Sequence, residues 1–383
     1  HLRTFKAWLF QQIKFEDLLC PAQIDNKRSS LSNSDFYYDK AWDLALMFPM
    51  LEMARRGHIK HIPDILYVYN DNNPINDHKM DVQRIVKLDA YARSRKKYEP
   101  LLSPVYIDNS EQKSDLIVYS KNRPLQLFSF LESLNKYSTG VNQVFVVYAA
   151  DNSYEYGYQE IFNKFPGLRI YRQNNNLHGN DFKQINLEIV NNLTSNYVVF
   201  AVDDIIVKDN FDFAECAKYL SHTNAYGFYL RLGDHVDYCY TENRHQGIPH
   251  LIPVSEAVGA WRFSSGQADW KYPNCLDMTI YKKDIAISAI RNLSYKAPNS
   301  MEGTWAGHAD NSKLGLCYYD SKIVNLPLNL VNTEITGNRH MGQYSALQLF
   351  EIFKRGLKID ISKLEKVRNR SAHMEYEPSF IIR

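Results

Sequence analysis

Residues 197–209 read YVVFAVDDIIVKD, and this stretch decides the fold class that the sequence predicts. An apolar run of strand character, Tyr197 to Val202, ends in two adjacent carboxylates, Asp203 and Asp204. In open α/β sheets, ligands bind outside the carboxyl ends of the strands. Hard divalent cations that bind diphosphates need one or two carboxylates together with substrate oxygens. The stretch therefore predicts a buried strand that delivers an acidic ligand site, with a strand followed by a solvated polar turn as the alternative.

The residues before this strand alternate between strand and helix patterns. Each of three apolar runs is followed by a segment with helical periodicity. The predicted strands are 116–119, 144–148 and 168–171, and the clearest predicted helices are 124–137 and 181–193. Such an alternation indicates an α/β fold with a mostly parallel sheet and flanking helices. The carboxylates then lie at the carboxyl edge of the sheet, where a nucleotide could bind.

Beyond residue 209 the alternation loosens. Short strands are predicted at 227–232, 278–282, 315–319 and 323–326, and helices near 285–293 and 345–355. The segment KAPNSMEGTWAGHAD places Glu302 in a polar turn or at the start of a helix. Near the other end of the chain, 40–56 and 81–97 read as helices, and 59–69 reads as short strands.

Composition limits the classes of function. The 383 residues are 45% hydrophobic and 23% charged, as in soluble globular proteins, and the net charge of +2 offers no electrostatic footprint for nucleic acid. The five cysteines are widely spaced and include no C-x-x-C pair, which favours a reducing, cytoplasmic location. No apolar run is long enough for a transmembrane segment, and peripheral membrane association stays open. The chain begins inside a helical pattern without Met, so we expect upstream sequence to be missing.

From Ser114 to Arg383 the chain resembles the GT-A-fold nucleotide-sugar glycosyltransferases related to glycosyltransferase family two. The residues that carry the resemblance are SKNRP after the first strand, VDDII in the position of a DxD motif, LDMTIY, PNSMEG and the C-terminal SAHMEY. The resemblance implies a metal-dependent transferase that moves a sugar from a nucleotide diphosphate, UDP- or GDP-linked, to a hydroxyl group. The acceptor would be a glycan, a lipid-linked sugar or a protein.

Residues 1–98 are similar to the C-terminal half of a second family-two domain, in which Asp43 matches the acceptor-side acid. This segment has no strand followed by an acid pair, so we expect it to be inactive by itself. The predicted organisation is a partial, mainly helical GT-A segment at 1–98, a linker at 99–113 and a GT-A domain at 114–383.

The resemblance assigns the metal and the acceptor chemistry to five acidic or imidazole side chains. Asp204 would contact Mn²⁺ or Mg²⁺, and Asp203 would contact the donor ribose or a metal-bound water. His308 is a further candidate metal ligand, although a lone histidine is more often structural. Glu302 matches the base that takes the proton of the acceptor hydroxyl, with a helix-start acid as the alternative. Asp277 would bind the acceptor hydroxyl, with strand-edge solvation as the alternative.

The donor side is predicted to involve the end of the first strand. Candidate donor-binding residues are Tyr119, Ser120, Asn122 and Arg123, and Lys183 could reach a phosphate from a helix start. Exposed basic residues are more often only solvated.

Two other functions stay open at the level of sequence. A sugar nucleotidyltransferase would share the alternating fold and the acid-bound metal, but SKNRP lacks the glycines of its phosphate loop. A non-catalytic pseudo-glycosyltransferase that binds glycans is the other. The chain has no G-x-G-x-x-G, G-x-x-x-x-G-K-[ST], H-E-x-x-H or G-x-S-x-G motif, which removes the simplest dehydrogenase, NTPase, metalloprotease and hydrolase readings.

Overall fold

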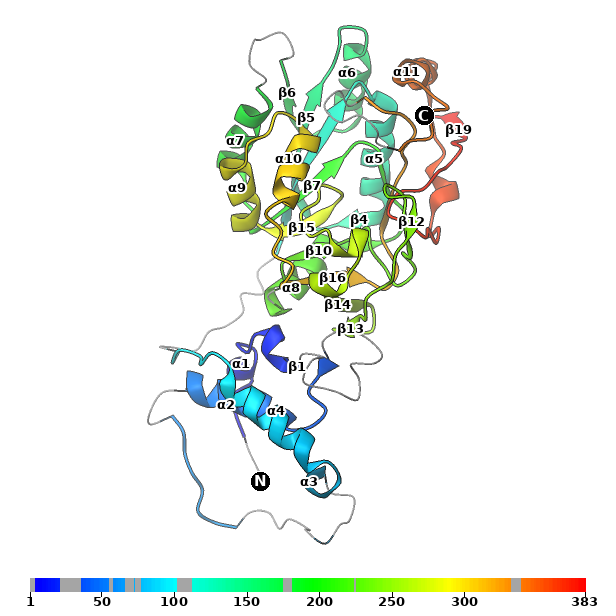
Figure 1. The fold of residues 1–383 in the computed structure, drawn as a ribbon. Helices are drawn as coiled ribbons and strands as arrows, with labels where there is room; N and C mark the ends of the chain where they lie inside the picture. Colours follow the sequence, from blue (N-terminus) through cyan, green and yellow to red (C-terminus); the bar gives the residue numbers. More distant parts are fainter. Residues whose placement is uncertain are drawn as a thin grey trace. The chain divides into compact units, whose positions relative to one another are not determined.

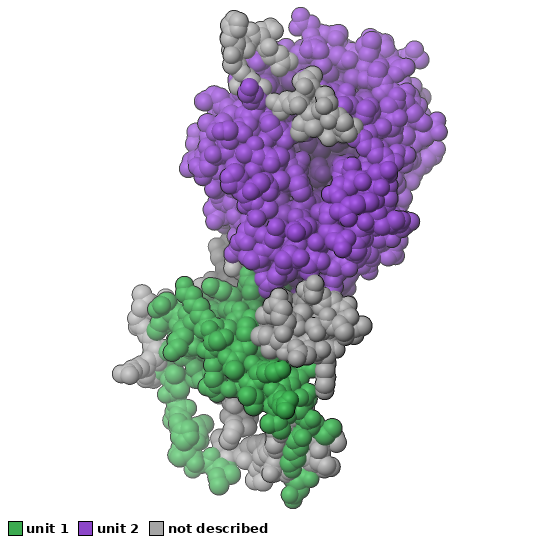
Figure 2. Space-filling view, viewed as in Figure 1, with its two compact units in different colours: residues 1–110, 222–224 green, residues 111–221, 225–383 purple. Residues whose placement is uncertain are grey.

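The computed structural model describes residues 4–20, 36–54, 58–65, 72, 77–101, 112–174, 181–223, 225–331 and 339–383. The chain divides into two compact units, one of residues 1–110 with 222–224 and one of residues 111–221 with 225–383 (Figure 2). Most of the predicted linker lies outside the described residues. The assignment of the segment before it to a partial transferase domain stays a prediction.

The first unit is mainly helical where it is described. Its helices are α1 (Ala7–Phe10), α2 (Trp42–Met53), α3 (Asp77–Met80) and α4 (Val82–Ser94), and β1 (Leu19–Cys20) pairs with β2 (Phe36–Tyr37). A small core joins Tyr38, Ala45 and Leu88. Residues 58–65 contain no strand, so that part of the strand prediction at 59–69 was wrong, and the rest lies outside the described residues.

The second unit is built on a nine-stranded sheet in the order β13-β14-β16-β10-β15-β7-β3-β5-β6 (Figure 1). The strands are β3 (Ser114–Lys121), β5 (Val141–Ala149), β6 (Arg169–Arg172), β7 (Tyr197–Val202), β10 (Gly227–Tyr229), β13 (Ile252–Pro253), β14 (Val258–Arg262), β15 (Thr279–Lys282) and β16 (Leu314–Tyr318). The pairings make β14 and β15 run opposite to the other seven strands. The predicted α/β fold with a mostly parallel sheet is therefore confirmed.

Helices cover both faces of this sheet (Figure 1). One layer contains α5 (Pro124–Tyr137), α6 (Glu155–Lys164) and α11 (Ala346–Lys354), and the other contains α7 (Phe182–Asn192), α9 (Lys283–Asn292) and α10 (Pro298–Ala306). Side chains alternate between the faces of a strand, so Ile117 and Tyr119 of β3 share the α7, α9 and α10 side with Phe200 of β7. A sheet buried on both faces needs nearly continuous apolar strands, which explains why the central strands were readable from the sequence.

The described part of the second unit also contains one further α-helix and four two-stranded pairs. Helix α8 spans Phe213–Thr223, and two-stranded pairs join β8 (Ile205–Val207) to β17 (Ile323–Asn325), β4 (Ser138–Thr139) to β9 (Phe211–Asp212), β11 (Tyr238–Cys239) to β12 (Arg244–His245), and β18 (Leu357–Ile359) to β19 (Phe380–Ile382). None of the helices in the described ranges is both long and apolar enough to cross a bilayer.

The register of the central strands brings two loops together. Tyr119 of β3 lies beside Val202, the last residue of β7, in a parallel pairing, so both strands end at the same edge, with β3 two residues longer. Thr279 of β15 lies beside Phe200 in an antiparallel pairing, so the residues just before β15 approach the same edge. The loops after β3 and β7 and the segment before β15 therefore share the carboxyl edge of the sheet.

All five cysteines are buried, and none of them forms a disulfide bond. Cys20 belongs to the first unit, and the other four, Cys216, Cys239, Cys275 and Cys317, belong to the second. Burial raises the pKa of the thiols of Cys239 and Cys275. In the folded protein these groups are neutral thiols held in the interior.

Candidate active site

The two carboxylates after β7 have different environments. Asp203 is buried, and its Oδ2 accepts hydrogen bonds from Ser120 Oγ at 2.8 Å and from the Lys121 amide at 3.3 Å. The Asp204 side chain is 18% exposed, six times the 3% of Asp203. The Asp203 carboxylate is thus occupied by hydrogen bonds from the protein, whereas the Asp204 carboxylate is accessible to a ligand that enters from solvent.

Arg123 bridges the pair. Its Nη1 lies 3.0 Å from Asp203 Oδ1 and 3.1 Å from Asp204 Oδ2. Its Nε donates to Asn329 Oδ1 at 2.8 Å, and its Nη2 donates to the Asn329 carbonyl. Burial raises the pKa of Asp203 to about 6, because the attraction of Arg123 offsets only part of the lost hydration and Asp204 repels a second charge.

A second set of contacts holds the loop after β3. The Tyr158 hydroxyl lies 2.7 Å from Ser120 Oγ and accepts from the Arg123 amide at 3.2 Å. Asn122 has a φ of +52°, a left-handed conformation that asparagine tolerates better than most residues. Its side chain exchanges hydrogen bonds with Asp151 after β5, at 2.7 and 2.9 Å. These hydrogen bonds fix the backbone of the loop after β3 and therefore the position of the Arg123 side chain.

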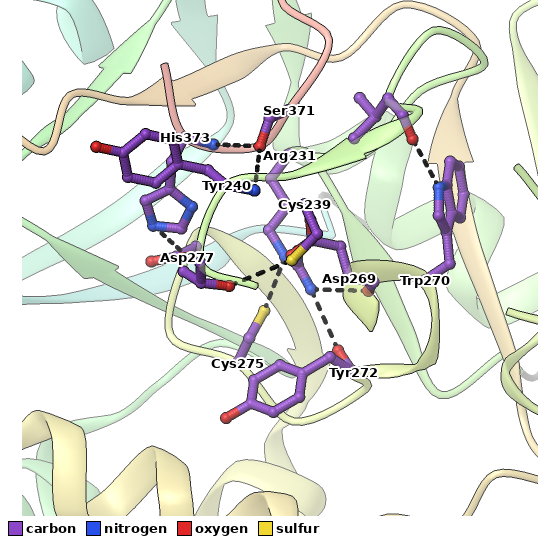
Figure 3. Close-up of polar contacts among 12 residues, drawn as sticks. Arg231, Cys239, Tyr240, Asp269, Trp270, Tyr272, Cys275, Asp277, Ser371 and His373 are labelled. Atoms are coloured by element: carbon purple, nitrogen blue, oxygen red, sulfur yellow. Dashed lines mark hydrogen bonds and ion pairs between the residues drawn. The ribbon is translucent and has the colours of Figure 1, made fainter. Parts of the chain in front are cut away.

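Asp277 lies at the same edge, immediately before β15. The Met278 amide donates to the Phe200 carbonyl at 2.9 Å, which anchors Asp277 beside the end of β7. Its Oδ1 accepts from Asn325 Nδ2 at 3.1 Å, and its Oδ2 lies 4.0 Å from His373 Nε2. Figure 3 shows Asp277 and His373 facing one another, with Tyr240 stacked on the imidazole at 6.1 Å.

The segment that leads to Asp277 is held by Arg231, whose side chain is 2% exposed (Figure 3). Its Nη1 lies 3.0 Å from Asp269 Oδ1, and its Nε lies 3.3 Å from Cys275 Sγ. Its Nη2 donates to the carbonyls of Asp269 and Tyr272, each at 3.2 Å. A buried guanidinium that satisfies four groups of one loop fixes the path of that loop.

Glu302 approaches the same segment from α10. Its Oε1 accepts from the Leu276 amide at 2.9 Å. Burial, and next the negative charge of Asp277, raise the pKa of Glu302 to about 8. A proton on Glu302 at neutral pH is therefore expected, and a perturbed acid of this kind is typical of functional sites.

The other candidates from the sequence lie elsewhere. The Tyr119 ring packs in the core against Phe182 at 5.0 Å, and its hydroxyl donates to Asn186 Oδ1 at 2.6 Å. Lys183 Nζ donates to the Leu293 carbonyl at 2.6 Å. His308 is exposed after α10 and contacts the Thr304 carbonyl through Nδ1 at 2.9 Å. The site thus gathers Ser120, Asn122, Arg123, Asp203, Asp204, Asp277 and Glu302, while these three side chains have partners of their own.

Sequence reasoning missed four side chains that complete the site. Tyr158 and Asn329 hold Arg123, and Asn325 and His373 hold Asp277. The only sequence signal near them was the resemblance of the C-terminal SAHMEY segment. The Asn325 side chain contacts Asp277, and the amide of the next residue, Leu326, donates to the Asp204 carbonyl at 2.8 Å. One short segment therefore contacts the Asp277 carboxylate and the Asp204 backbone.

In the space-filling view, residues 111–383 carry a hollow on the face that is drawn, at the height of β7 in Figure 1 (Figure 2).

No family model matches the chain. It is 28% identical over 185 residues to the bifunctional glycosyltransferase pgtA of Dictyostelium discoideum, a match that covers 44% of this chain and 23% of that protein. The chain thus spans less than a quarter of the length of this relative.

Among solved structures, TarS of S. aureus (residues 1–349, with UDP) is 14% identical, with 55% of this chain and 59% of that chain covered and a TM-score of 0.38. The mannosyltransferase PcManGT of Pyrobaculum calidifontis, solved with GDP-Man and Mn²⁺, is 12% identical, with 55% and 56% covered and a TM-score of 0.32.

Proposed function

We propose that residues 111–383 transfer a sugar from a nucleotide diphosphate donor to a hydroxyl group of a glycan, lipid or protein. The observation that carries the proposal is the gathering of Asp203, Asp204, Asp277 and Glu302 at the carboxyl edge of one α/β sheet. This edge is where such sheets bind nucleotides. The sequence match to a curated glycosyltransferase supports the same class of reaction.

A divalent cation, Mn²⁺ or Mg²⁺, fits Asp204 better than Asp203. Both oxygens of Asp203 already accept hydrogen bonds from protein groups, whereas Asp204 is partly exposed and contacts Arg123 through one oxygen. When bound, such a cation neutralises the charge that builds on the diphosphate leaving group. Asp204 would hold the cation, while Asp203 and Asn329 would keep Arg123 in place. His308 as a second ligand stays a proposal that no contact to Asp204 supports among the described residues.

The donor would meet the loop after β3. Asn122, whose side chain contacts Asp151, is partly exposed in this loop and could meet a nucleoside. Ser120 is buried near the end of β3, where its hydroxyl contacts Asp203, so its role as a donor contact stays a prediction. The Lys183 ammonium would first have to leave the Leu293 carbonyl.

Glu302 and Asp277 would act on the acceptor. The acceptor oxygen forms a bond to the anomeric carbon, the bond from that carbon to the phosphate oxygen breaks, and the hydroxyl proton passes to the Glu302 carboxylate. Because the pKa of Glu302 is raised to about 8, only its ionised fraction can accept this proton. We therefore expect the rate of transfer to increase with pH up to about 8.

Calorimetry with UDP and GDP, each with and without Mn²⁺, tests the donor half of this proposal. Asp204→Asn should abolish metal-dependent nucleotide binding, whereas Glu302→Gln should keep binding and lose turnover. Asp310→Asn, at an exposed acid after α10, is the matched control and should change neither. If nucleotide binding shows no dependence on metal, the transferase proposal is wrong; binding without turnover by the unmodified protein on any sugar donor would favour a non-catalytic binding module.

A further inference from the structure

A second acidic cluster lies in the loops after β10 and β16, apart from the residues described above. Asp234 and His235 follow β10, and Asp320 follows β16, which pairs in parallel with β10. The Asp234 amide donates to the Tyr319 carbonyl at 2.8 Å, so the two loops are bonded to each other. Gly233 permits this approach, because a Cβ there would lie 2.7 Å from the Tyr319 carbonyl oxygen.

The three side chains converge. One ligand atom from each of Asp234, His235 and Asp320 lies within 4.8 Å of the others. His235 Nδ1 is 3.5 Å from Asp234 Oδ1 and 3.9 Å from Asp320 Oδ1. A tetrahedral Zn²⁺ with bonds of about 2.1 Å separates its ligands by about 3.4 Å, so only small movements are needed to close the set.

The environment of His235 is a second, independent observation that points to a bound cation. Its side chain is 6% exposed, and its Nδ1 has no hydrogen-bond partner among the residues that the structure describes. Its other nitrogen, Nε2, lies 3.1 Å from Ser321 Oγ. Since that hydroxyl donates to Asn369 Oδ1 at 3.4 Å, it accepts from Nε2–H, which leaves the lone pair on Nδ1. A histidine whose far nitrogen is held by a hydrogen bond, with the near one aimed at two carboxylates, has the tautomer of a metal ligand.

We infer that Asp234, His235 and Asp320 bind a divalent transition-metal ion of the Zn²⁺ type. One imidazole nitrogen and two carboxylates suit Zn²⁺, Co²⁺ or Mn²⁺, whereas Ca²⁺ and Mg²⁺ prefer oxygen ligands alone. The two carboxylates balance the charge of the cation.

Arg368 is the competitor for this site. Its Nη2 lies 3.1 Å from Asp234 Oδ1, the same oxygen that faces His235. The Arg368 side chain is 66% exposed, so it can turn into solvent when a cation binds. Lys208 offers no such competition, because its Nζ donates to the Val367 carbonyl at 2.7 Å. An exposed ion pair contributes at most about 1 kcal/mol, so its loss should tighten metal binding by no more than about fivefold.

Titration of the chelator-treated full chain with Co²⁺ tests the inference, because the visible absorption of Co²⁺ reports its coordination. In an Asp204→Asn background, which removes the proposed donor-metal ligand, we expect one Co²⁺ site to remain. His235→Gln and Asp320→Asn should each weaken it by at least about 30-fold. Arg368→Gln should tighten it by about two- to fivefold. His58→Gln, at an exposed histidine of the first unit, is the matched control.

The opposite signs of these effects separate binding from misfolding. The Asp320 side chain is 69% exposed, so its substitution should not alter folding, and the circular dichroism spectrum checks this. Zn²⁺ should raise the thermal midpoint of Asp204→Asn and not that of the double variant Asp204→Asn, Asp320→Asn. Equal Co²⁺ affinity in the Asp204→Asn background with and without His235→Gln or Asp320→Asn would overturn the inference, as would the absence of any Co²⁺ site in that background.

Discussion

Arg123→Met is the substitution that most directly tests the network around the acid pair. It removes two ion pairs, at 3.0 and 3.1 Å, and both guanidinium bonds to Asn329 while it keeps a side chain of similar length. Removal of one partner from a buried ion pair costs about 3–5 kcal/mol, because the other charge stays buried and unpaired. We expect a loss of this size in the free energy of unfolding at pH 8.

The loss should be smaller at pH 5. The pKa of Asp203 is already raised to about 6 by burial, and Arg123 is the main group that lowers it, so the substitution raises it further. An acid whose pKa is higher in the folded than in the unfolded state binds more protons when folded, and stability then increases as pH falls. With Asp203 neutral, only an unsatisfied polar contact of about 1–3 kcal/mol remains.

Urea unfolding of the full chain at pH 5 and pH 8, followed by tryptophan fluorescence, measures both values. Trp261 and Trp270 are buried in the second unit and report its unfolding. The double variant Arg123→Met, Asp203→Asn should recover part of the stability lost at pH 8. A cost below about 1 kcal/mol at pH 8, or a double variant less stable than the single one, would show that Asp203 is not held by Arg123.

Three further substitutions have outcomes that thermal or urea unfolding can check. Because the pKa of Glu302 is raised from 4.5 to about 8, its ionisation destabilises the folded state as pH rises. Glu302→Gln should therefore have a higher free energy of unfolding than the unmodified protein at pH 9 and nearly the same value at pH 5. Asp115 is fully buried and accepts four hydrogen bonds, at 2.8 to 3.0 Å. Asp115→Ala should therefore lower the free energy of unfolding by about 2–4 kcal/mol, and a loss under about 1 kcal/mol would contradict the role of these bonds. Tyr158→Phe removes a hydroxyl that contacts Ser120 and the Arg123 amide and should cost about 1–2 kcal/mol, whereas Tyr156→Phe, at an exposed neighbour, should leave the unfolding midpoint unchanged.

The central sheet was predictable because each of its main strands and helices is encoded by a pattern within its own stretch of sequence. β7 spans Tyr197–Val202 and α5 spans Pro124–Tyr137, both as the sequence predicted. Buried parallel strands and amphipathic helices can be predicted from apolar patterns that span only a few residues. The strands β11, β12 and β13 have two residues each and form through tertiary contacts, so no periodicity could reveal them.

The site was only half predictable for the same reason. Asp203, Asp204 and Arg123 follow recognisable strands, so their proximity could be expected from topology. The role of Arg123 as partner of both acids could not, since it depends on Asn329, which is 206 positions away. The contacts of Asp277 with Asn325 and His373 likewise join segments that are distant in the chain. His235 and Asp320 are brought together by a strand pairing that the sequence did not indicate.

The buried cysteines can serve as natural chemical probes of partial unfolding. A thiol reagent attacks the thiolate, so a neutral, buried thiol reacts only when the surrounding structure opens. Cys20 would report opening of the first unit, and Cys216 and Cys317, whose pKa values burial raises well above the ordinary value, would report opening of the second. Mass spectrometry after timed alkylation could therefore resolve the opening rates of the two units in one sample, without an engineered label.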